Sequence, residues 1–303
     1  MRIVSLIASA TEIVCALGFE DQLVGRSHEC DFPPSVARLP VCTSPKFKVA
    51  GSSAEIDARV KEILQQALSV YHVDADKLRD LQPEVIVTQT QCEVCAVSEK
   101  DVATALCQWT DSTAQVVSMA TNALPDFWTD IHRIAAALGA PERGTALVHD
   151  LQNRMASIAA TAAKAPHRPT VACVEWIDPL MSAGNWMPEL IDMAGGRMLF
   201  GEPGRHSPRL SWEDFCRADP HVIFVMPCGW DIAKAREEMP ALTRKSEWPT
   251  LRAIQQCQVY LADGNQYFNR PGPRLVESLE ILAEVLHPEL FQISHQGIGW
   301  QQL

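Results

Sequence analysis

The chain has 303 residues, of which 47% are hydrophobic, and it carries a formal net charge of -11 at pH 7. This apolar fraction can supply the core of one large domain or of two smaller ones. The excess of acidic residues repels phosphate backbones and argues against nucleic acid as a partner. No apolar run approaches the ~18 residues that a membrane-spanning helix needs, and Val222–Met226 has only the length of a strand.

The N-terminus and the cysteines bear on the compartment. Met1 and Arg2 lead directly into the apolar Ile3–Ile7, without the features of an export signal. Ten cysteines in one chain would risk wrong disulfides in an oxidising compartment. We therefore expect a cytoplasmic protein, or a periplasmic one if the N-terminus has been trimmed.

The first part of the chain alternates predicted strands and helices. Residues 2–8 form a strand, and Ser9-Ala10-Thr11-Glu12 has the pattern of a capping box that opens a helix ending near Gly18. Six further elements follow in order: a short strand from Val24, a helix over 51–70, a short helix over 76–81, a strand over 84–88, a helix over 98–109 and a strand over 115–118. The continuous apolar character of 84–88 suits a parallel sheet covered on both faces.

The middle of the chain is helical over 125–138 and 141–164, with no strand between. At ~1.5 Å per residue the second helix would exceed ~30 Å. The alternation then restarts with a strand over 170–174, helices over 187–194 and 212–218, strands over 222–226 and 259–261, and a helix over 273–286. This order predicts an α/β protein with an N-terminal lobe over 1–124, a helical connector over 125–165 and a C-terminal lobe over 166–303.

Ligands of open parallel sheets bind beyond the carboxyl ends of the strands. The loops after the predicted strands of this chain contain aromatic residues suited to a ring system or macrocycle, with core filling as the alternative, and polar residues that can orient a ligand. The predicted ligand contacts are Ser9, Thr11, His28, Glu29, Gln91, Glu175, Trp176, Asn185, Trp186, Trp230, Asn265, Tyr267, Phe268 and Arg270. No nucleophile with a matching base, Gly-rich phosphate loop or GxSxG elbow stands out, so we expect no enzyme.

Several thiols and one imidazole offer metal chemistry. Cys92 and Cys95 have the CxxC spacing, and His28, Cys30 and Cys228 come from other loops of the same predicted edge. Such groups bind zinc, an iron-sulfur cluster or the cobalt of a corrinoid. The simpler interpretation is that these cysteines are small buried hydrophobic residues and that the protein requires no cofactor. His28 has two alternatives of its own, ligation of cobalt and hydrogen bonding to a ligand amide or carboxylate.

Segments spread over nearly the whole chain carry a family resemblance. These are Ser5–Ile13, Leu23–Pro34, Asp80–Val87, Gly184–Gly196, and Ser211–Asp214 through Asp219-Pro220. In order and spacing they resemble the vitamin B12 and iron-siderophore substrate-binding proteins of ABC importers, most closely the cobalamin-binding ones. The resemblance implies a class III periplasmic-binding-protein fold, in which one rigid helix spans two α/β lobes and the ligand lies between them. It also implies a monomer.

The resemblance further implies a membrane permease as partner. In that family an acidic residue on each lobe pairs with permease arginines, and by position these residues are Asp76 and Glu213 here. Carboxylates at such positions steer docking electrostatically. The alternative is ordinary helix chemistry, because negative charge is favourable in the first turn of any helix.

The leading hypothesis is therefore non-catalytic binding of cobalamin or a related corrinoid, as the substrate-binding component of an ABC importer or as a cytosolic relative of one. An alternative from another class is a cytosolic metal-dependent or iron-sulfur enzyme or redox protein on the same scaffold, using the cleft cysteines and His28. Haem or a ferric siderophore as ligand is the third alternative.

Overall fold

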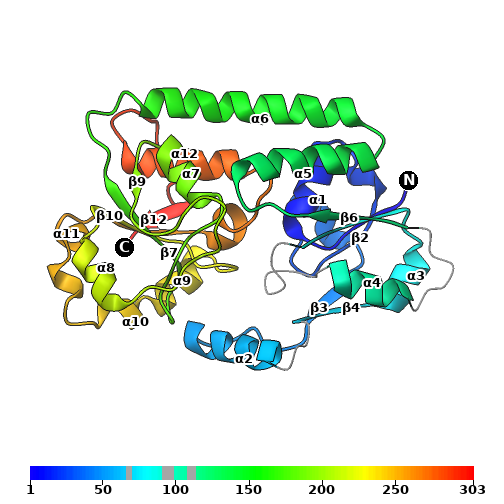
Figure 1. The fold of residues 1–303 in the computed structure, drawn as a ribbon, viewed down its shortest axis with the longest axis horizontal. Helices are drawn as coiled ribbons and strands as arrows, with labels where there is room; N and C mark the ends of the chain where they lie inside the picture. Colours follow the sequence, from blue (N-terminus) through cyan, green and yellow to red (C-terminus); the bar gives the residue numbers. More distant parts are fainter. Residues whose placement is uncertain (66–69, 91–98, 108–113) are drawn as a thin grey trace. The chain divides into compact units, whose positions relative to one another are not determined.

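The computed structural model describes residues 1–65, 70–90, 99–107 and 114–303 (Figure 1). The chain forms two compact units, each made of three separate segments. Unit 1 comprises Met1–Gly51, Ala58–Thr121 and Pro125–Asp150, and unit 2 comprises Ser52–Asp57, Asn122–Leu124 and Leu151–Leu303. The boundaries that the sequence predicts at 124 and 165 stay a prediction.

Unit 1 is built on a four-stranded parallel sheet with the order β2-β1-β5-β6. These strands are β1 (Ile3–Ser5), β2 (Leu23–Arg26), β5 (Val85–Gln89) and β6 (Gln115–Met119), and an antiparallel pair is formed by β3 (Thr43–Pro45) and β4 (Tyr71–Val73). The helical elements are α1 (Ala8–Ala16), η1 (Glu20–Gln22), η2 (Pro34–Arg38), α3 (Ala75–Leu81), α4 (Glu99–Cys107) and α5 (Leu124–Ala137). Because all four strands of the larger sheet are parallel, the loops after their carboxyl ends share one edge.

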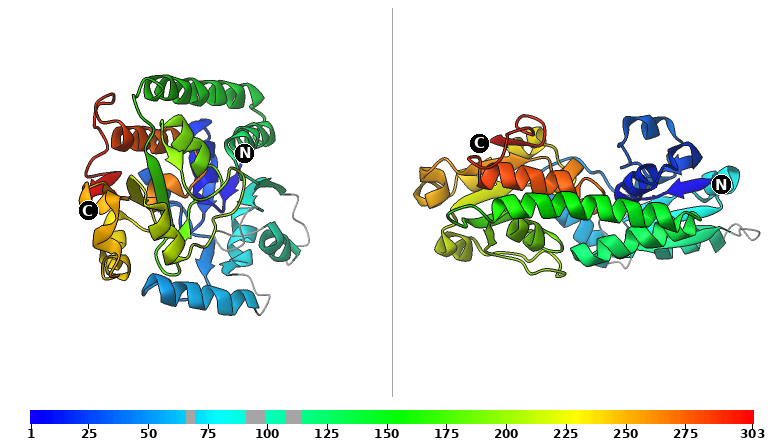
Figure 2. Two further views of the ribbon diagram at one scale, coloured as in Figure 1. Left: turned by 60° about the vertical axis from the view of Figure 1, so that its left-hand side comes forward. Right: turned by 90° about the horizontal axis from the view of Figure 1, so that it is seen from above.

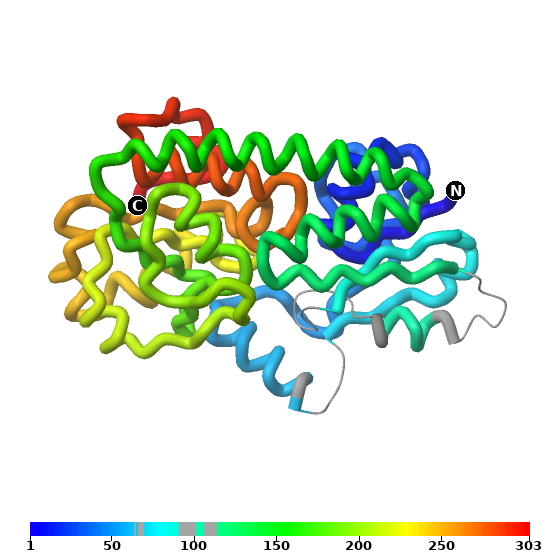
Figure 3. The backbone as a smooth tube through the Cα atoms, turned by 45° about the horizontal axis from the view of Figure 1, so that its top comes forward, coloured from blue at the N-terminus to red at the C-terminus, as the bar shows by residue number. Residues whose placement is uncertain are grey.

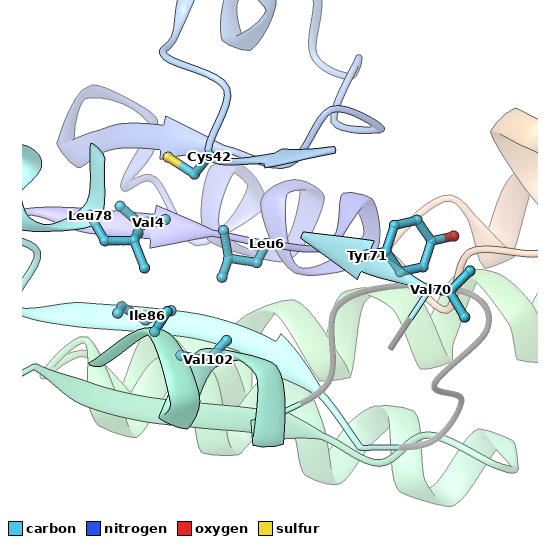
Figure 4. Close-up of a cluster of buried hydrophobic side chains, with 9 residues drawn as sticks. Val4, Leu6, Cys42, Val70, Tyr71, Leu78, Ile86 and Val102 are labelled. Carbon is cyan, nitrogen blue, oxygen red and sulfur yellow. The ribbon is translucent and has the colours of Figure 1, made fainter. Parts of the chain in front are cut away.

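One face of this sheet is covered by a hydrophobic cluster. Val4 of β1 and Ile86 of β5 are register partners, and both are fully buried. Leu78 of α3 and Val102 of α4 belong to the same cluster (Figure 4). Since burial of one aliphatic side chain contributes about 1.5–3 kcal/mol, this packing fixes the two helices on the sheet.

Unit 2 contains a six-stranded mixed sheet with the order β12-β11-β10-β7-β8, in which β9 also pairs with β7. The strands are β7 (Thr170–Trp176), β8 (Met181–Ser182), β9 (Arg197–Met198), β10 (Val222–Val225), β11 (Val259–Ala262) and β12 (Trp300–Gln302). β7, β10 and β11 run parallel, so their carboxyl ends meet at one edge. The helical elements are α7 (Met187–Met193), α8 (Trp212–Ala218), α9 (Ile232–Glu238), α10 (Pro240–Thr243), η3 (Trp248–Thr250), α11 (Arg252–Gln255), the π-helical turn η4 (Gly264–Phe268) and α12 (Leu275–Leu286).

The longest helix, α6 (Pro141–Ala162), has 22 residues and is therefore ~33 Å long. It belongs to unit 1 as far as Asp150 and to unit 2 from Leu151. In unit 2 it lies beside α12 (Figure 2), where Arg154 pairs with Glu280 at 3.3 Å. The sequence predicted this helix over 141–164.

The last strand of unit 2 is held by Glu284, a buried carboxylate on α12. It accepts hydrogen bonds from Ser294 Oγ at 2.6 Å, His295 Nδ1 at 2.8 Å and Trp300 Nε1 at 3.0 Å. Burial alone would raise the pKa of Glu284, but the hydrogen bonds outweigh it and hold the pKa below its usual value. The ionised carboxylate therefore fixes β12 against β11.

The capping box predicted at Ser9 is wrong. α1 begins one residue earlier, its N-cap residue is Ile7, and no side chain caps it. Ser9 and Thr11 are fully buried, and their hydroxyl groups make tertiary contacts instead, with Met119 Sδ at 3.9 Å and Ser5 Oγ at 2.8 Å. A hydroxyl that has no access to solvent satisfies whichever partner the core provides.

Candidate ligand-binding site

The strand-end loops of unit 1 form one surface, here called the unit 1 rim (residues 6–11, 27–30, 90 and 120–121). Backbone hydrogen bonds join its members. Ser27 N donates to Ser5 O at 2.9 Å, and Thr90 N donates to Met119 O at 2.8 Å. The loops after β1 and β2, and those after β5 and β6, are therefore held together without help from a ligand.

Small polar side chains fill the inside of the unit 1 rim. Thr11 Oγ1 lies 2.8 Å from Ser5 Oγ and 3.0 Å from Cys30 Sγ. Cys30 is 1% exposed and Ser9 is fully buried. Ser9, Thr11 and Cys30 thus lie in one region, as their strand-end positions predicted. Because they are enclosed, they act on a ligand only through the loops that they hold in place.

His28 is the unit 1 residue with the most suitable chemistry for direct contact. Its Nδ1 lies 2.8 Å from Thr43 Oγ1, which also accepts the backbone N–H of His28 at 3.1 Å. Burial, and secondarily the charge of Arg26, lower the pKa of His28 below 6.5. The imidazole is consequently neutral at pH 7. Its Nε2 lies 3.9 Å from Glu29 Oε1, and a neutral imidazole can ligate a metal or hydrogen-bond a ligand.

The strand-end loops of unit 2 form a second surface, the unit 2 rim (residues 175–186, 226–231 and 263–270). Cys228 N donates to Glu175 O, and Asn265 N donates to Trp230 O, both at 3.1 Å. The indole rings of Trp176 and Trp230 lie 4.9 Å apart at an interplanar angle of 41°. The end of β7 and the loop after β10 therefore bring two large aromatic groups together.

Other aromatic residues of the unit 2 rim are enclosed in the fold. Trp186 donates its Nε1 proton to Phe268 O at 3.1 Å. Phe268 has no exposed surface and packs edge-on against Phe224 at 5.1 Å, while Tyr267 is buried. Core filling, the alternative weighed for the aromatic residues, thus describes Phe268. The predicted ligand contacts of Trp186 and Tyr267 stay predictions.

The polar residues predicted for the unit 2 rim are each held by a neighbour. Glu175 Oε1 accepts from Ser207 Oγ at 2.8 Å, and Arg270 Nη2 donates to Asn265 Oδ1 at 2.8 Å. Asn185 adopts a φ of 53° and donates its backbone N–H to Arg205 O at 2.6 Å. Sequence reasoning missed Ser207, which follows no strand and lies in no motif. Only the folded chain reveals its link to Glu175.

Asp263 is a further residue that the predicted contact set omitted. It caps η4 by accepting from Gln266 N at 2.7 Å, and burial raises its pKa. Its position directly after β11 is the signal that would have found it, by the same strand-end rule that selected Asn265.

The predicted metal ligands are only partly within the described structure. Gln91, Cys92 and Cys95 lie outside the described residues. Over 1–65, 70–90, 99–107 and 114–303, no three His, Cys, Asp or Glu side chains gather closely enough to hold a metal ion. Cys30 is enclosed in unit 1, and Cys228 is half-buried in unit 2. Zinc or an iron-sulfur cluster at these cysteines stays a prediction.

The two acidic residues predicted to dock a permease differ in their pairing. Asp76, in the first turn of α3, lies 2.7 Å from Arg79 Nη2. Glu213, in the first turn of α8, is exposed, whereas its neighbour Asp214 is paired with Arg217 at 2.6 Å. Both carboxylates thus lie where the helix dipole favours them.

An open cavity of about 570 Å³ lies elsewhere in unit 2, lined mainly by residues of α7 and β9 and of the loop after β9. Arg197 of β9 pairs in register with Thr170, the first residue of β7. The cavity therefore lies toward the amino end of that strand, and it does not belong to the unit 2 rim. Within the described part of the chain, no helix is both long and apolar enough to cross a membrane.

The chain consists of two α/β units that share one long helix, and each unit has its candidate contacts at the ends of its strands. This arrangement is typical of two-lobed α/β binding proteins. The chain belongs to the periplasmic binding protein family, whose model matches residues 3–265. This membership confirms the resemblance seen in the sequence. It also confirms the expectation of a binding protein rather than an enzyme, because the relatives with assigned functions are binding proteins.

Individual relatives extend over most of the chain. It is 24% identical over 280 residues to the vitamin B12-binding protein of Vibrio cholerae serotype O1, covering 92% of this chain and 86% of that protein. It is 22% identical over 297 residues to the uncharacterized ABC transporter substrate-binding lipoprotein YvrC of Bacillus subtilis strain 168, covering 96% of this chain and 81% of that protein.

Solved structures establish the fold. The periplasmic vitamin B12 binding protein BtuF of Vibrio cholerae matches with a TM-score of 0.68 at 22% identity, over 96% of this chain and 98% of that one. A periplasmic heme binding protein from Pseudomonas aeruginosa matches with a TM-score of 0.70 at 21% identity, over 97% and 95%. The predicted fold class, α/β of the periplasmic-binding-protein type, is confirmed.

Proposed function

We propose that the chain binds cobalamin or a related corrinoid, as the substrate-binding component of an ABC importer or as a cytosolic relative of one. The names of the relatives from Vibrio cholerae and Bacillus subtilis support this proposal. The observation that carries it is the pair of indoles, Trp176 at the end of β7 and Trp230 in the loop after β10, since these two strands are parallel neighbours. Flat apolar groups at a strand edge suit a macrocycle better than a small polar solute.

Burial of the aromatic pair contributes to the affinity for such a ligand. Because Trp230 is only 7% exposed and Trp176 is half-buried, a ligand covers only a fraction of the ~150–250 Å² that an aromatic side chain can bury. Association also costs at least about 4 kcal/mol in lost freedom of motion. The indole pair therefore supplies part of the ~8 kcal/mol of a micromolar complex, and polar contacts supply the rest.

Calorimetric titration with cyanocobalamin and hydroxocobalamin tests the proposal. We expect a dissociation constant in the micromolar range or below, together with thermal stabilisation by the ligand. The change Trp230→Ala should weaken binding about 30-fold, which corresponds to the ~2 kcal/mol of a central aromatic contact. Trp128→Ala is the matched control, because Trp128 is half-buried on α5 beside Phe127. Absence of both heat and stabilisation with both ligands would reject corrinoid binding.

Haem is the second candidate ligand. The neutral imidazole of His28, oriented through Thr43, suits an iron as well as a cobalt. A parallel titration with haemin decides between the two ligands, and tighter binding of haemin than of either cobalamin would favour haem. His28→Ala should then abolish the spectral signature of imidazole ligation while leaving the fold intact.

We propose further that a permease, where one is present, docks on Glu213 and Asp76 of a monomer. Glu213 carries the larger share, because the carboxylate of Asp76 is already paired with Arg79. With a corrinoid permease reconstituted in lipid nanodiscs, Glu213→Lys should weaken docking more than Asp76→Lys, and the difference should shrink at high salt. Glu237→Lys, at an exposed position of α9, is the control for net charge.

A further inference from the structure

The helix α2 (Ser53–Gln65) begins in one unit and continues in the other. The chain leaves unit 1 after Gly51, its next six residues belong to unit 2, and unit 1 resumes at Ala58. The backbone path from β3 into this helix can be followed in Figure 3. We call residues Ser52–Asp57 the α2 latch.

Polar contacts fasten the α2 latch to the rest of unit 2. The backbone N–H and the hydroxyl of Ser53 both donate to Glu238 Oε2, at 3.1 and 3.3 Å. Trp176 donates its Nε1 proton to Ser53 O at 3.3 Å. Asp57 pairs with Arg209 at 3.3 Å, and Ser53 is only 1% exposed.

These partners lie at the aromatic pair of the unit 2 rim. Trp176 is the last residue of β7, and its single ring N–H, which a polar ligand group could accept, is used by the latch. Glu238 also binds Lys234 at 3.2 Å, and the Lys234 ammonium lies 5.3 Å from the centre of the Trp230 ring. One small network therefore connects the latch with both indoles.

The contacts that hold the latch are few. The partly exposed ion pair of Asp57 with Arg209 is weak, the hydrogen bonds of Ser53 to the Glu238 carboxylate are stronger because their acceptor is charged, and Ile56 is the one buried apolar side chain of the latch. Gly51, immediately before the latch, has a φ of 125°, in the region that favours glycine. Immediately after the latch, Arg59 donates to Lys48 O and Ala50 O at 2.9 and 2.7 Å. The rest of α2 is thus tied to unit 1.

We propose that the α2 latch is a lid on the Trp176 and Trp230 pair, and that it must detach from Glu238 and Arg209 before a ligand gains full access to Trp176. The proposal rests on the proposed function for the nature of the ligand, but not for the existence of the lid. Detachment restores the Trp176 N–H to the site, and reattachment covers the indole again.

A first experiment requires no ligand. Glu238→Ala removes the main acceptor of the latch, whereas Glu237→Ala removes the other carboxylate near Lys234, at 3.5 Å, without touching the latch. We expect amide hydrogen exchange in residues 53–57 to rise about tenfold in Glu238→Ala only. The fluorescence of 8-anilinonaphthalene-1-sulfonate, a probe of exposed apolar surface, should rise in the same variant. Equal exchange and fluorescence in the two variants, at unchanged circular dichroism, overturn the lid.

A second experiment measures gating with cyanocobalamin in stopped flow. We expect the association rate of Glu238→Ala to exceed that of the unaltered protein and of Glu237→Ala several-fold, because opening precedes binding. Faster exchange without faster association shows that the latch opens but does not gate, which also overturns the lid. If none of the three proteins binds cyanocobalamin or hydroxocobalamin, the corrinoid proposal fails, while the exchange and fluorescence results still decide on the lid.

Discussion

The two rims differ in their side chains, which are small and polar in unit 1 and large and aromatic in unit 2. The unit 1 rim is closed by small hydroxyl and thiol groups that hydrogen-bond among themselves, as Thr11, Ser5 and Cys30 do. The unit 2 rim is closed by large aromatic rings, of which Trp176 and Trp230 form the central pair. Aromatic area supplies affinity and fixed polar groups supply orientation. The two rims therefore offer a ligand different chemistry, apolar area in unit 2 and fixed polar groups in unit 1.

The largest expected effect comes from Gly264 in the unit 2 rim. A Cβ at this position would lie 2.1 Å from Pro227 O and 2.6 Å from Met226 O, both backbone atoms. Gly264→Ala should therefore lower the free energy of unfolding by about 3 kcal/mol and weaken cyanocobalamin binding, because the loops after β10 and β11 must separate. Urea denaturation and calorimetry measure the two effects.

Gly229→Ala is the matched control, since nothing lies within 4 Å of a Cβ there. Its φ of 75° costs about 1–2 kcal/mol with alanine. Equal losses of stability in the two variants would show that the close contact at Gly264 relaxes freely. In that case the unit 2 rim would be less rigid than its hydrogen bonds indicate.

A smaller effect is expected from Thr11→Val in the unit 1 rim. Valine has the shape of threonine but removes the hydroxyl that contacts Ser5 Oγ and Cys30 Sγ. Both groups keep a bond, to Ile7 O and to Ser5 O, so the loss of stability should be about 1 kcal/mol. Because Thr11 is fully buried, the affinity for cyanocobalamin should change by less than about twofold. Thr129→Val, which loses an exposed bond to Pro125 O, should be nearly neutral. A tenfold loss of affinity in Thr11→Val would contradict the scaffold role of this rim.

A still smaller effect concerns the acid stability of unit 1. Since burial and Arg26 lower the pKa of His28, the folded chain binds a proton there more weakly than the unfolded chain does. The contribution of neutral His28 to the free energy of unfolding is therefore present above the ordinary pKa of 6.5. It is lost as the pH falls toward the lowered pKa of the folded chain. Urea denaturation at about pH 7.5 and about pH 5.5 should show that His28→Gln loses less stability on acidification than the unaltered chain. Solvent around the side chain, which is 24% exposed, keeps the effect modest.

The sequence predicted the long and regular parts of the fold better than the short ones. α6 and β5 were expected within two residues of their observed ends, because helical period and continuous apolar runs are local signals. β12 was missed, since a strand of three residues forms only where β11 offers it an antiparallel partner about 40 positions away. Its anchor, Glu284, is likewise recognisable only in three dimensions.

The candidate site shows the same division. The strand-end rule selected His28 and Trp230, which follow β2 and β10, and Trp176, which ends β7, because topology alone places them. The rule could not distinguish the enclosed Thr11 from the half-exposed His28, since burial depends on packing. Nor could it find Ser53, whose contact with Trp176 joins positions 123 residues apart.

The smallest effect distinguishes the two units by the reactivity of their thiols. Only the thiolate attacks iodoacetamide, and burial raises the pKa of Cys15 to about 12 and of Cys42 to about 11. Cys257 is exposed and Cys228, in the unit 2 rim, is half-buried. Peptide mass spectrometry after brief alkylation at about pH 8 should therefore find Cys257 and Cys228 modified, with Cys15 and Cys42 intact. Cyanocobalamin should then protect Cys228 and leave Cys257 reactive, whereas equal protection of both, or of neither, would argue against a ligand on the unit 2 rim.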